Sequence, residues 1–201
     1  DGPDAANCLV QLTIALGELG KLTEASAVFQ QLAEKHEQSE GVGLAADHLA
    51  ETAYHKGEIH LARDLVERMA REGATPAIRE KGLSGLAWSQ LKSNEIEASA
   101  ATFETLLQLH ADSPLAPEAA LARARALETA NRLNSAIATY TLLFERYPDS
   151  KQAVVGKYQA ARLHLQLKQY DEAFALFASI RRDHKDFPRL DEVLYEWAWA
   201  L

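Results

Sequence analysis

Small and large apolar residues recur along this chain at a fixed interval of 37 residues. The small residues at one recurring position are Ala25, Ala62, Ser99, Ala136 and Ala173. Large residues follow four and seven places later: Phe29, Val66, Phe103, Tyr140 and Phe177, then Leu32, Met69, Leu106, Leu143 and Ile180. Side chains separated by three or four residues lie on one face of an α-helix. Each interval is therefore predicted to contain an amphipathic helix.

A second series of small residues lies twelve places before the first. Its members are Thr13, Ala50, Ala87, Ala124 and Ala161, and Ala198 continues it. Small side chains at matched positions on two helices let their axes approach closely. Each interval is therefore predicted to be a helical hairpin. Self-similarity at a fixed interval is typical of a repeat array, in which every unit packs on its neighbours.

Turn residues complete the pattern, with Gly20 and Gly57 between the two helices of a unit and Tyr147-Pro148-Asp149-Ser150 between units. With these residues the chain resembles the tetratricopeptide repeat family, whose unit is about 34 residues. The longer interval indicates divergent 37-residue units. The resemblance implies an all-α, right-handed superhelical α-solenoid of stacked antiparallel helix pairs with about five and a half repeats. We expect one solenoid over residues 1–201, with units at about 6–42, 43–79, 80–116, 117–153 and 154–190 and a partial unit at 191–201.

The breaks between helices follow from glycine, proline and capping residues. The expected helices are 5–19, 23–36, 44–56, 58–71, 77–92, 95–110, 117–130, 134–146, 151–167, 171–183 and 190–201. Residues 37–43 are expected to form a loop, and Gly73-Ala74 another break, followed by Thr75 as an N-cap and Pro76 in the first turn. Because the repeat pattern stops within a unit, we expect the chain to be a fragment of a longer array.

Composition and charge exclude several classes of function. The chain is 47% hydrophobic and 25% charged, and it has no long uncharged apolar run, so we expect no membrane insertion. Its net charge of −8 disfavours nucleic acid, which needs a basic surface. The single Cys8 excludes an internal disulfide bond.

No catalytic or cofactor-binding motif emerges. The best metal-ligand pattern is His48, Glu51 and His55 on one helical face, with His60 nearby. The first helix of a repeat, however, has a solvated face that is rich in His and Glu for other reasons. We therefore expect a protein that is not an enzyme and has no cofactor, no metal and no catalytic residues.

The family resemblance implies that the first helices of successive units line a concave groove. In that register the predicted partner-binding residues are Tyr54, Trp88, Leu121, Arg125, Tyr158, Arg162, Tyr195 and Trp199. Aromatic residues and arginine often dominate binding energy. Arg125 and Arg162, 37 residues apart, are expected to hold an acidic side chain or a peptide carboxylate. The alternative for Trp88 and Tyr158 is that they pack against the next helix.

Three functions stay open at this point. The first is a non-enzymatic protein–protein interaction scaffold that binds a peptide or helix in its concave groove. The second is a regulatory or assembly arm of a larger multidomain enzyme or envelope or secretion complex. The third is a self-associating structural module, with a homodimer through the C-terminal helix. The boundary sequence 144–150 is similar to that of bacterial cell-envelope members of the family, which favours a bacterial protein of the periplasm or cytoplasm.

Overall fold

The computed structural model describes residues 3–37, 39–72 and 75–200, which contain eleven α-helices. The expected break at Gly73-Ala74 and the expected last helical residue Leu201 lie outside the described residues. The chain divides into two compact units, Asp1–Ser93 and Asn94–Leu201. Within the described residues, none of the helices combines the length and the hydropathy that a membrane span needs.

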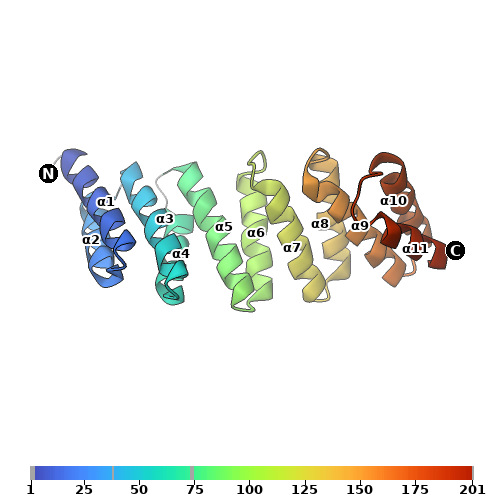
Figure 1. The fold of residues 1–201 in the computed structure, drawn as a ribbon, viewed down its shortest axis with the longest axis horizontal. Helices are drawn as coiled ribbons and strands as arrows, with labels where there is room; N and C mark the ends of the chain where they lie inside the picture. The colour runs from blue at the N-terminus through green and yellow to red at the C-terminus, as the bar shows by residue number, and fades with distance from the viewer. Residues whose placement is uncertain (1–2, 38, 73–74, 201) are drawn as a thin grey trace. The chain divides into compact units, whose positions relative to one another are not determined.

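The first unit consists of two complete helical hairpins and the first helix of a third (Figure 1). Its helices are α1 (Pro3–Glu18), α2 (Leu22–Lys35), α3 (Glu40–His55), α4 (Ile59–Glu72) and α5 (Pro76–Lys92). Consecutive helices pack against each other, and α3 also packs against the first helices on either side, α1 and α5. The first helices therefore form a row, and its surface carries the candidate site.

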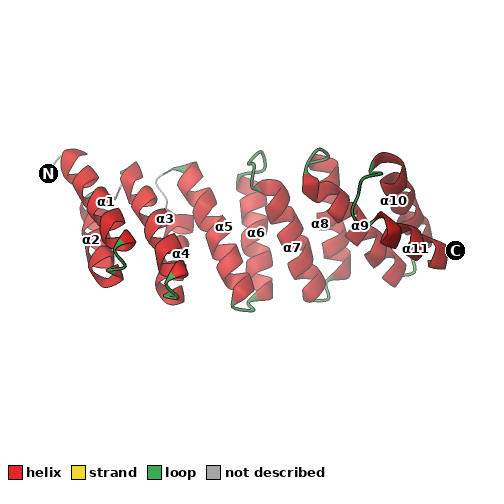
Figure 2. Cartoon of the chain, in the orientation of Figure 1, coloured by secondary structure: helices red, strands yellow, loops and turns green. Residues whose placement is uncertain are grey.

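The second unit is also built of helical hairpins, and its described part consists of helices joined by loops, with no strand (Figure 2). Its helices are α6 (Ile96–Leu109), α7 (Ala116–Thr129), α8 (Leu133–Arg146), α9 (Lys151–Gln166), α10 (Tyr170–Asp183) and α11 (Leu190–Ala200). Here α7 and α9 are neighbouring first helices, and α11 packs against α10.

The core of both units is built from the residues that recur every 37 positions. The small residues of the two series are buried, from Thr13 and Ala25 to Ala161 and Ala173. The large residues beside them are also buried, with the exception of Val66, which is only partly buried. The predicted all-α fold of helical hairpins is therefore confirmed, with helix ends within one or two residues of the expected ones at most positions.

The turn inside each hairpin is also periodic. The second residue after each first helix has a left-handed backbone, with φ of 74° at Gly20, 83° at Gly57, 61° at Asn94, 57° at Asn131 and 60° at Lys168. The following amide closes the turn by donating to a carbonyl five residues earlier, as from Lys21 to Leu16 over 2.9 Å. This pattern terminates a helix with a residue whose φ is positive.

The expected loop over residues 37–43 is wrong in its second half, because α3 begins at Glu40. Ser39 caps the helix, and its hydroxyl accepts a hydrogen bond from the Gly41 amide over 3.3 Å. A Cβ on Gly43 would lie 2.2 Å from Cδ1 of Ile78 on α5. This glycine therefore allows two helices to approach closely, a role that the sequence pattern does not separate from that of a loop glycine.

Candidate functional site

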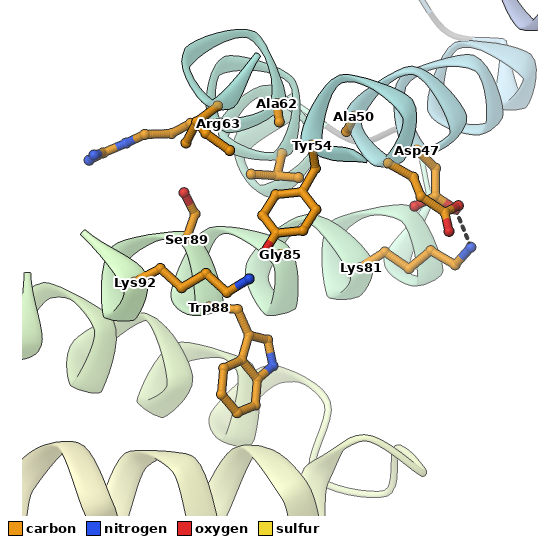
Figure 3. A pocket seen from close by; sticks show the side chains of 13 residues that line it. Asp47, Ala50, Tyr54, Ala62, Arg63, Lys81, Gly85, Trp88, Ser89 and Lys92 are labelled. Carbon is orange, nitrogen blue, oxygen red and sulfur yellow. Dashed lines mark hydrogen bonds and ion pairs between the residues drawn. The ribbon is translucent and has the colours of Figure 1, made fainter. Parts of the chain in front are cut away.

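A groove of about 470 Å³ lies between α3, α4 and α5 in the first unit. Three small or short apolar residues line it, Ala50, Ala62 and Val66, together with Gly85 on α5. The predicted binding residues Tyr54 and Trp88 line the same groove, from α3 and α5 respectively (Figure 3). Its volume lies in the range of roughly 300–1,000 Å³ that is typical of ligand sites.

The groove coincides with an irregularity in the repeat. Val66 occupies the position that is aromatic in the other four 37-residue repeats, where Phe29, Phe103, Tyr140 and Phe177 are at most 3% exposed. Gly85 faces Val66 so closely that a Cβ added there would lie 2.8 Å from Val66 Cγ1. The second 37-residue repeat thus has less side-chain volume at this helix junction than the other repeats have.

Tyr54 and Lys92 form the mouth of the groove. The Tyr54 ring extends from α3 toward Gly85 on α5, and the Lys92 ammonium lies 4.1 Å from its ring centroid (Figure 3). A cation in this position is attracted by the electron-rich ring face. Tyr54 keeps 42% of its surface exposed and Trp88 keeps 37%, so both aromatic side chains remain accessible.

An ion pair between Asp47 on α3 and Lys81 on α5 marks one end of the groove (Figure 3). Both side chains are about half exposed, so this pair adds little to stability. The same two residues also line a second groove of about 780 Å³, between α1, α3 and α5, where Leu44 and Ile78 supply apolar surface. The row of first helices in this unit therefore offers two adjoining grooves that share one ion pair.

In the second unit, the structure brings three predicted residues together. Arg162 on α9 and Tyr195 and Trp199 on α11 line a groove of about 300 Å³, with Glu128 on α7 at its edge. Tyr195 is 69% exposed and Trp199 is 83% exposed. The Arg162 Nε lies 3.3 Å from Glu196 Oε1, so this guanidinium already has a carboxylate partner in the chain itself.

Arg125 and Leu121 lie on α7, where Arg125 is exposed and Leu121 is partly buried. The positive charges of Arg125 and Arg162 both act on the Tyr140 hydroxyl and lower its pKa, but burial and Glu128 outweigh them and raise it. That hydroxyl donates to Glu128 Oε2 over 3.0 Å. The two arginines therefore lie around an internal Tyr–Glu pair, which provides acidic charge beside them.

Tyr158 does not line the groove of the second unit. Its side chain is fully buried, and its ring packs near those of Phe177 and Phe187, with centroid distances of 6.5 and 6.0 Å. Its hydroxyl lies 3.1 Å from both Glu192 Oε2 and Glu196 Oε1, and burial raises its pKa. For Tyr158 the structure thus shows the alternative role, packing against the next helix.

The pattern of metal ligands on α3 does not converge. His48 Nε2 lies 3.7 Å from Glu18 on α1, whereas His55 Nε2 lies 3.8 Å from Glu51. In the described part of the chain, no group of three His, Cys, Asp or Glu side chains has an arrangement that would hold a metal ion.

The lining residues of the first groove that were not predicted as binding residues include Val66, Gly85 and Lys92. Their signal in the sequence is weak, because Val66 fits the apolar series and Gly85 and Lys92 have no fixed place in it. The non-aromatic residue at position 66 is the one departure that a comparison of the five units could have identified.

The chain can now be compared with known proteins. Residues 85–151 match the sequence model described as tetratricopeptide repeat. No curated protein matches the chain at a significant level. Among solved structures, a tetratricopeptide repeat protein from Parabacteroides merdae is 16% identical with a TM-score of 0.64, covering 98% of this chain and 73% of that one. MamA AMB-1 is 15% identical with a TM-score of 0.61, covering 92% and 94%.

YrrB, described as a TPR protein with an unusual peptide-binding site, is 15% identical with a TM-score of 0.59, covering 88% of this chain and 87% of its own. At these identities the likeness to solved structures establishes the fold alone. The sequence model shows the sequence pattern of the repeat over residues 85–151. This fold is generally that of a non-catalytic protein–protein interaction scaffold. Residues 85–151 therefore match the tetratricopeptide repeat family in sequence, and both units have the helical-hairpin fold of the solved tetratricopeptide repeat structures.

Proposed function

We propose that this chain binds a peptide or helix of another protein along the row of first helices, and that the α3–α4–α5 groove is its main docking site. The observation that carries this proposal is the groove itself, in which Tyr54 and Trp88 remain exposed beside apolar residues. Aromatic side chains around a concave apolar surface are the usual anchors of protein interfaces. YrrB, a protein of the same fold, is described as having an unusual peptide-binding site, which supports peptide binding by this fold.

A display library of random linear peptides tests this proposal. Peptides that bind the 201-residue chain are selected, synthesised and measured by calorimetry against the double variant Tyr54→Ala, Trp88→Ala. Loss of two anchor side chains should weaken binding at least tenfold. The matched control is Leu19→Ala, which removes an apolar side chain that is 73% exposed at the end of α1 in the same unit.

The proposal fails if the library yields no binding peptide. It also fails, as regards the groove, if the selected peptides bind the double variant and the Leu19→Ala control equally well. Circular dichroism on each variant establishes that helicity is unchanged, so that a loss of affinity reports the surface and not the fold.

A second candidate function is self-association through α11, the homodimer expected from the sequence. It is favoured by the exposure of Leu194, Tyr195 and Trp199, of which 40%, 69% and 83% is exposed. Apolar patches of this kind often mark an interaction surface. The regulatory or assembly arm of a larger complex stays a prediction, and the same surfaces would serve it.

A further inference from the structure

We infer that the α3–α4–α5 groove selects an aromatic residue that stands next to an acidic residue inside a partner's chain. This inference rests on the proposed function and deepens it, because it gives the chemistry of the segment that the groove accepts. Two independent observations support it: the smaller side chain at position 66, and the cation at the groove mouth.

The small side chain of Val66 leaves apolar space in the groove. In four of the five repeats, an aromatic side chain fills the junction of the second helix with the neighbouring helices. This side chain is at most 3% exposed. In the second repeat Val66 leaves that junction partly open, and the small side chains of Ala50 and Ala62 line the space. Aromatic side chains bury about 150–250 Å² and pack well against other rings. A ring from the partner would therefore occupy the kind of apolar space that the repeat's own ring fills elsewhere, next to the exposed face of Tyr54.

The groove carries the positive charge of Lys92 at its mouth. Lys92 lies over the Tyr54 ring at the mouth, and among the described residues of the chain it forms no ion pair. The other lysine of the groove, Lys81, is neutralised by Asp47. Glu51 is 73% exposed and lies 3.8 Å from His55, on its own helix. Lys92 is thus a positive charge without an ion-pair partner among the described residues, whereas Glu51, which also lines the groove, is neutralised by His55 only when that ring is protonated. A carboxylate of the partner would complement Lys92.

The acidic group of the partner is expected to lie inside its chain and not at a chain end. The groove adjoins the larger α1–α3–α5 groove at the Asp47–Lys81 pair, because both residues line both spaces. A bound segment can therefore continue past the aromatic residue along the first helices. This continuity favours an internal Asp or Glu side chain over the carboxylate of a chain end.

Three short peptides test the need for the aromatic ring and for the negative charge. They are acetyl-Asp-Phe-Asp-amide, acetyl-Asp-Ala-Asp-amide without the ring, and acetyl-Asn-Phe-Asn-amide without the charge. Binding is followed by two-dimensional ¹H–¹⁵N NMR, through the amide signals of Gly85 and Ser89 on α5. The first peptide should shift these signals in a saturable way, and the peptide without a ring should not. The neutral peptide should bind about two- to fivefold more weakly at low salt, with a smaller difference at high salt.

Two kinds of variant separate the contributions. Lys92→Gln should remove the preference for the acidic peptide and keep the need for the ring, whereas Lys56→Gln, at an exposed lysine that follows α3, should change neither. Val66→Leu and Val66→Phe should lower the affinity progressively as they fill the groove. If Val66→Phe does not fold, Val66→Leu and the exposed Lys92→Gln still decide the result.

Equal shifts from the peptides with and without the ring would overturn the inference, as would a charge preference that survives Lys92→Gln. Unchanged affinity in Val66→Leu and Val66→Phe would also overturn it. The scaffold proposal is judged separately. Library peptides that bind Val66→Phe as well as wild type would uphold the scaffold and refute this pocket.

Discussion

A single backbone position shows how the repeat tolerates different residues at a demanding site. The second residue after each first helix has a positive φ, and the five repeats place Gly20, Gly57, Asn94, Asn131 and Lys168 there. Glycine adopts this conformation without a steric cost, and asparagine tolerates it better than most residues. Lysine has a Cβ and no local hydrogen bond to offset the crowding. Among these five residues, Lys168 therefore carries the largest backbone strain.

Lys168→Gly is expected to raise the free energy of unfolding by about 0.5–1 kcal/mol. The left-handed conformation costs an L-residue about 1–2 kcal/mol, and the greater chain entropy of glycine in the unfolded state offsets part of this gain. Urea denaturation followed by circular dichroism measures the difference. The reverse substitution, Gly57→Ala, should destabilise by a similar amount, since an added Cβ there meets no atom within 4 Å and the backbone alone is affected.

A decrease in stability for Lys168→Gly would mean that the lysine side chain contributes more than its backbone strain removes. The sequence predicted this turn where glycine marks it, at Gly20 and Gly57. It did not predict the same backbone at Lys168, because a lysine gives no sign of a positive φ. Only the 37-residue spacing from Gly57 and Asn131 identifies that position.

At the scale of the helix, α11 is attached to α9 by charged groups around a buried ring. Tyr158 of α9 lies within hydrogen-bond distance of both Glu192 and Glu196 of α11. The Arg189 guanidinium lies 4.6 Å from the Tyr158 ring centroid and donates to Glu192, over 3.0 Å from its Nε. Arg162 reaches Glu196 from the groove side. The packing of α11 therefore depends on whether its glutamate side chains are ionised.

The attachment of α11 should weaken as the pH falls below about 4.5, near the pKa of an unperturbed glutamate. The hydrogen bonds from Arg189 lower the pKa of Glu192 in the folded state. A lowered pKa means that the stabilisation is complete above the unfolded-state pKa and is lost as the pH falls through the folded-state value. The indole signal of Trp197, which packs against Arg181 of α10 at 4.8 Å, reports this change by NMR.

Glu192→Gln should reduce the response of the Trp197 signal to pH, because the ionisable group is removed and the shape is kept. Asp191→Asn is the matched control on the same turn, and its pH profile should follow that of the wild type. Identical profiles for wild type and Glu192→Gln would show that another group governs the loosening of α11.

The exposure of surface residues follows the 37-residue spacing at one position of the first helix and departs from it at another. Glu51, Trp88, Arg125, Arg162 and Trp199 occupy equivalent positions at 37-residue spacing, and all are exposed. Tyr158 and Tyr195 also occupy equivalent positions, yet Tyr158 is fully buried and Tyr195 is 69% exposed. The helical period gives the direction of a side chain from its own helix. It does not say what a later helix places over it, and here the glutamates of α11 meet Tyr158.

At the scale of the molecule, the repeat pattern predicted the fold of both units, while the features of the candidate site are departures from that pattern. Val66, Gly85 and Lys92 all line the α3–α4–α5 groove. Val66 is the non-aromatic member of its recurring series, and Gly85 and Lys92 have no place in that series. A periodic pattern reports what the units share, which is their core. Function in a repeat scaffold depends on how units differ, so it could be predicted only as a row of candidate surface positions. One solenoid over residues 1–201 stays a prediction.

Self-association through α11 is the prediction that belongs to the whole molecule. Because Leu194, Tyr195 and Trp199 are exposed, we expect the average mass in light scattering to rise from 22.1 kDa toward twice that value as the concentration increases. The double variant Tyr195→Asp, Trp199→Asp should hold the mass at the monomer value. Tyr170→Asp, which alters an aromatic residue that is 46% exposed at the start of α10, is the control and should dimerise like the wild type. A wild-type chain that stays at 22.1 kDa up to millimolar concentration would leave this surface to a different protein, in accord with the scaffold function. If instead all three proteins dimerise alike, the contact lies on another face of the chain.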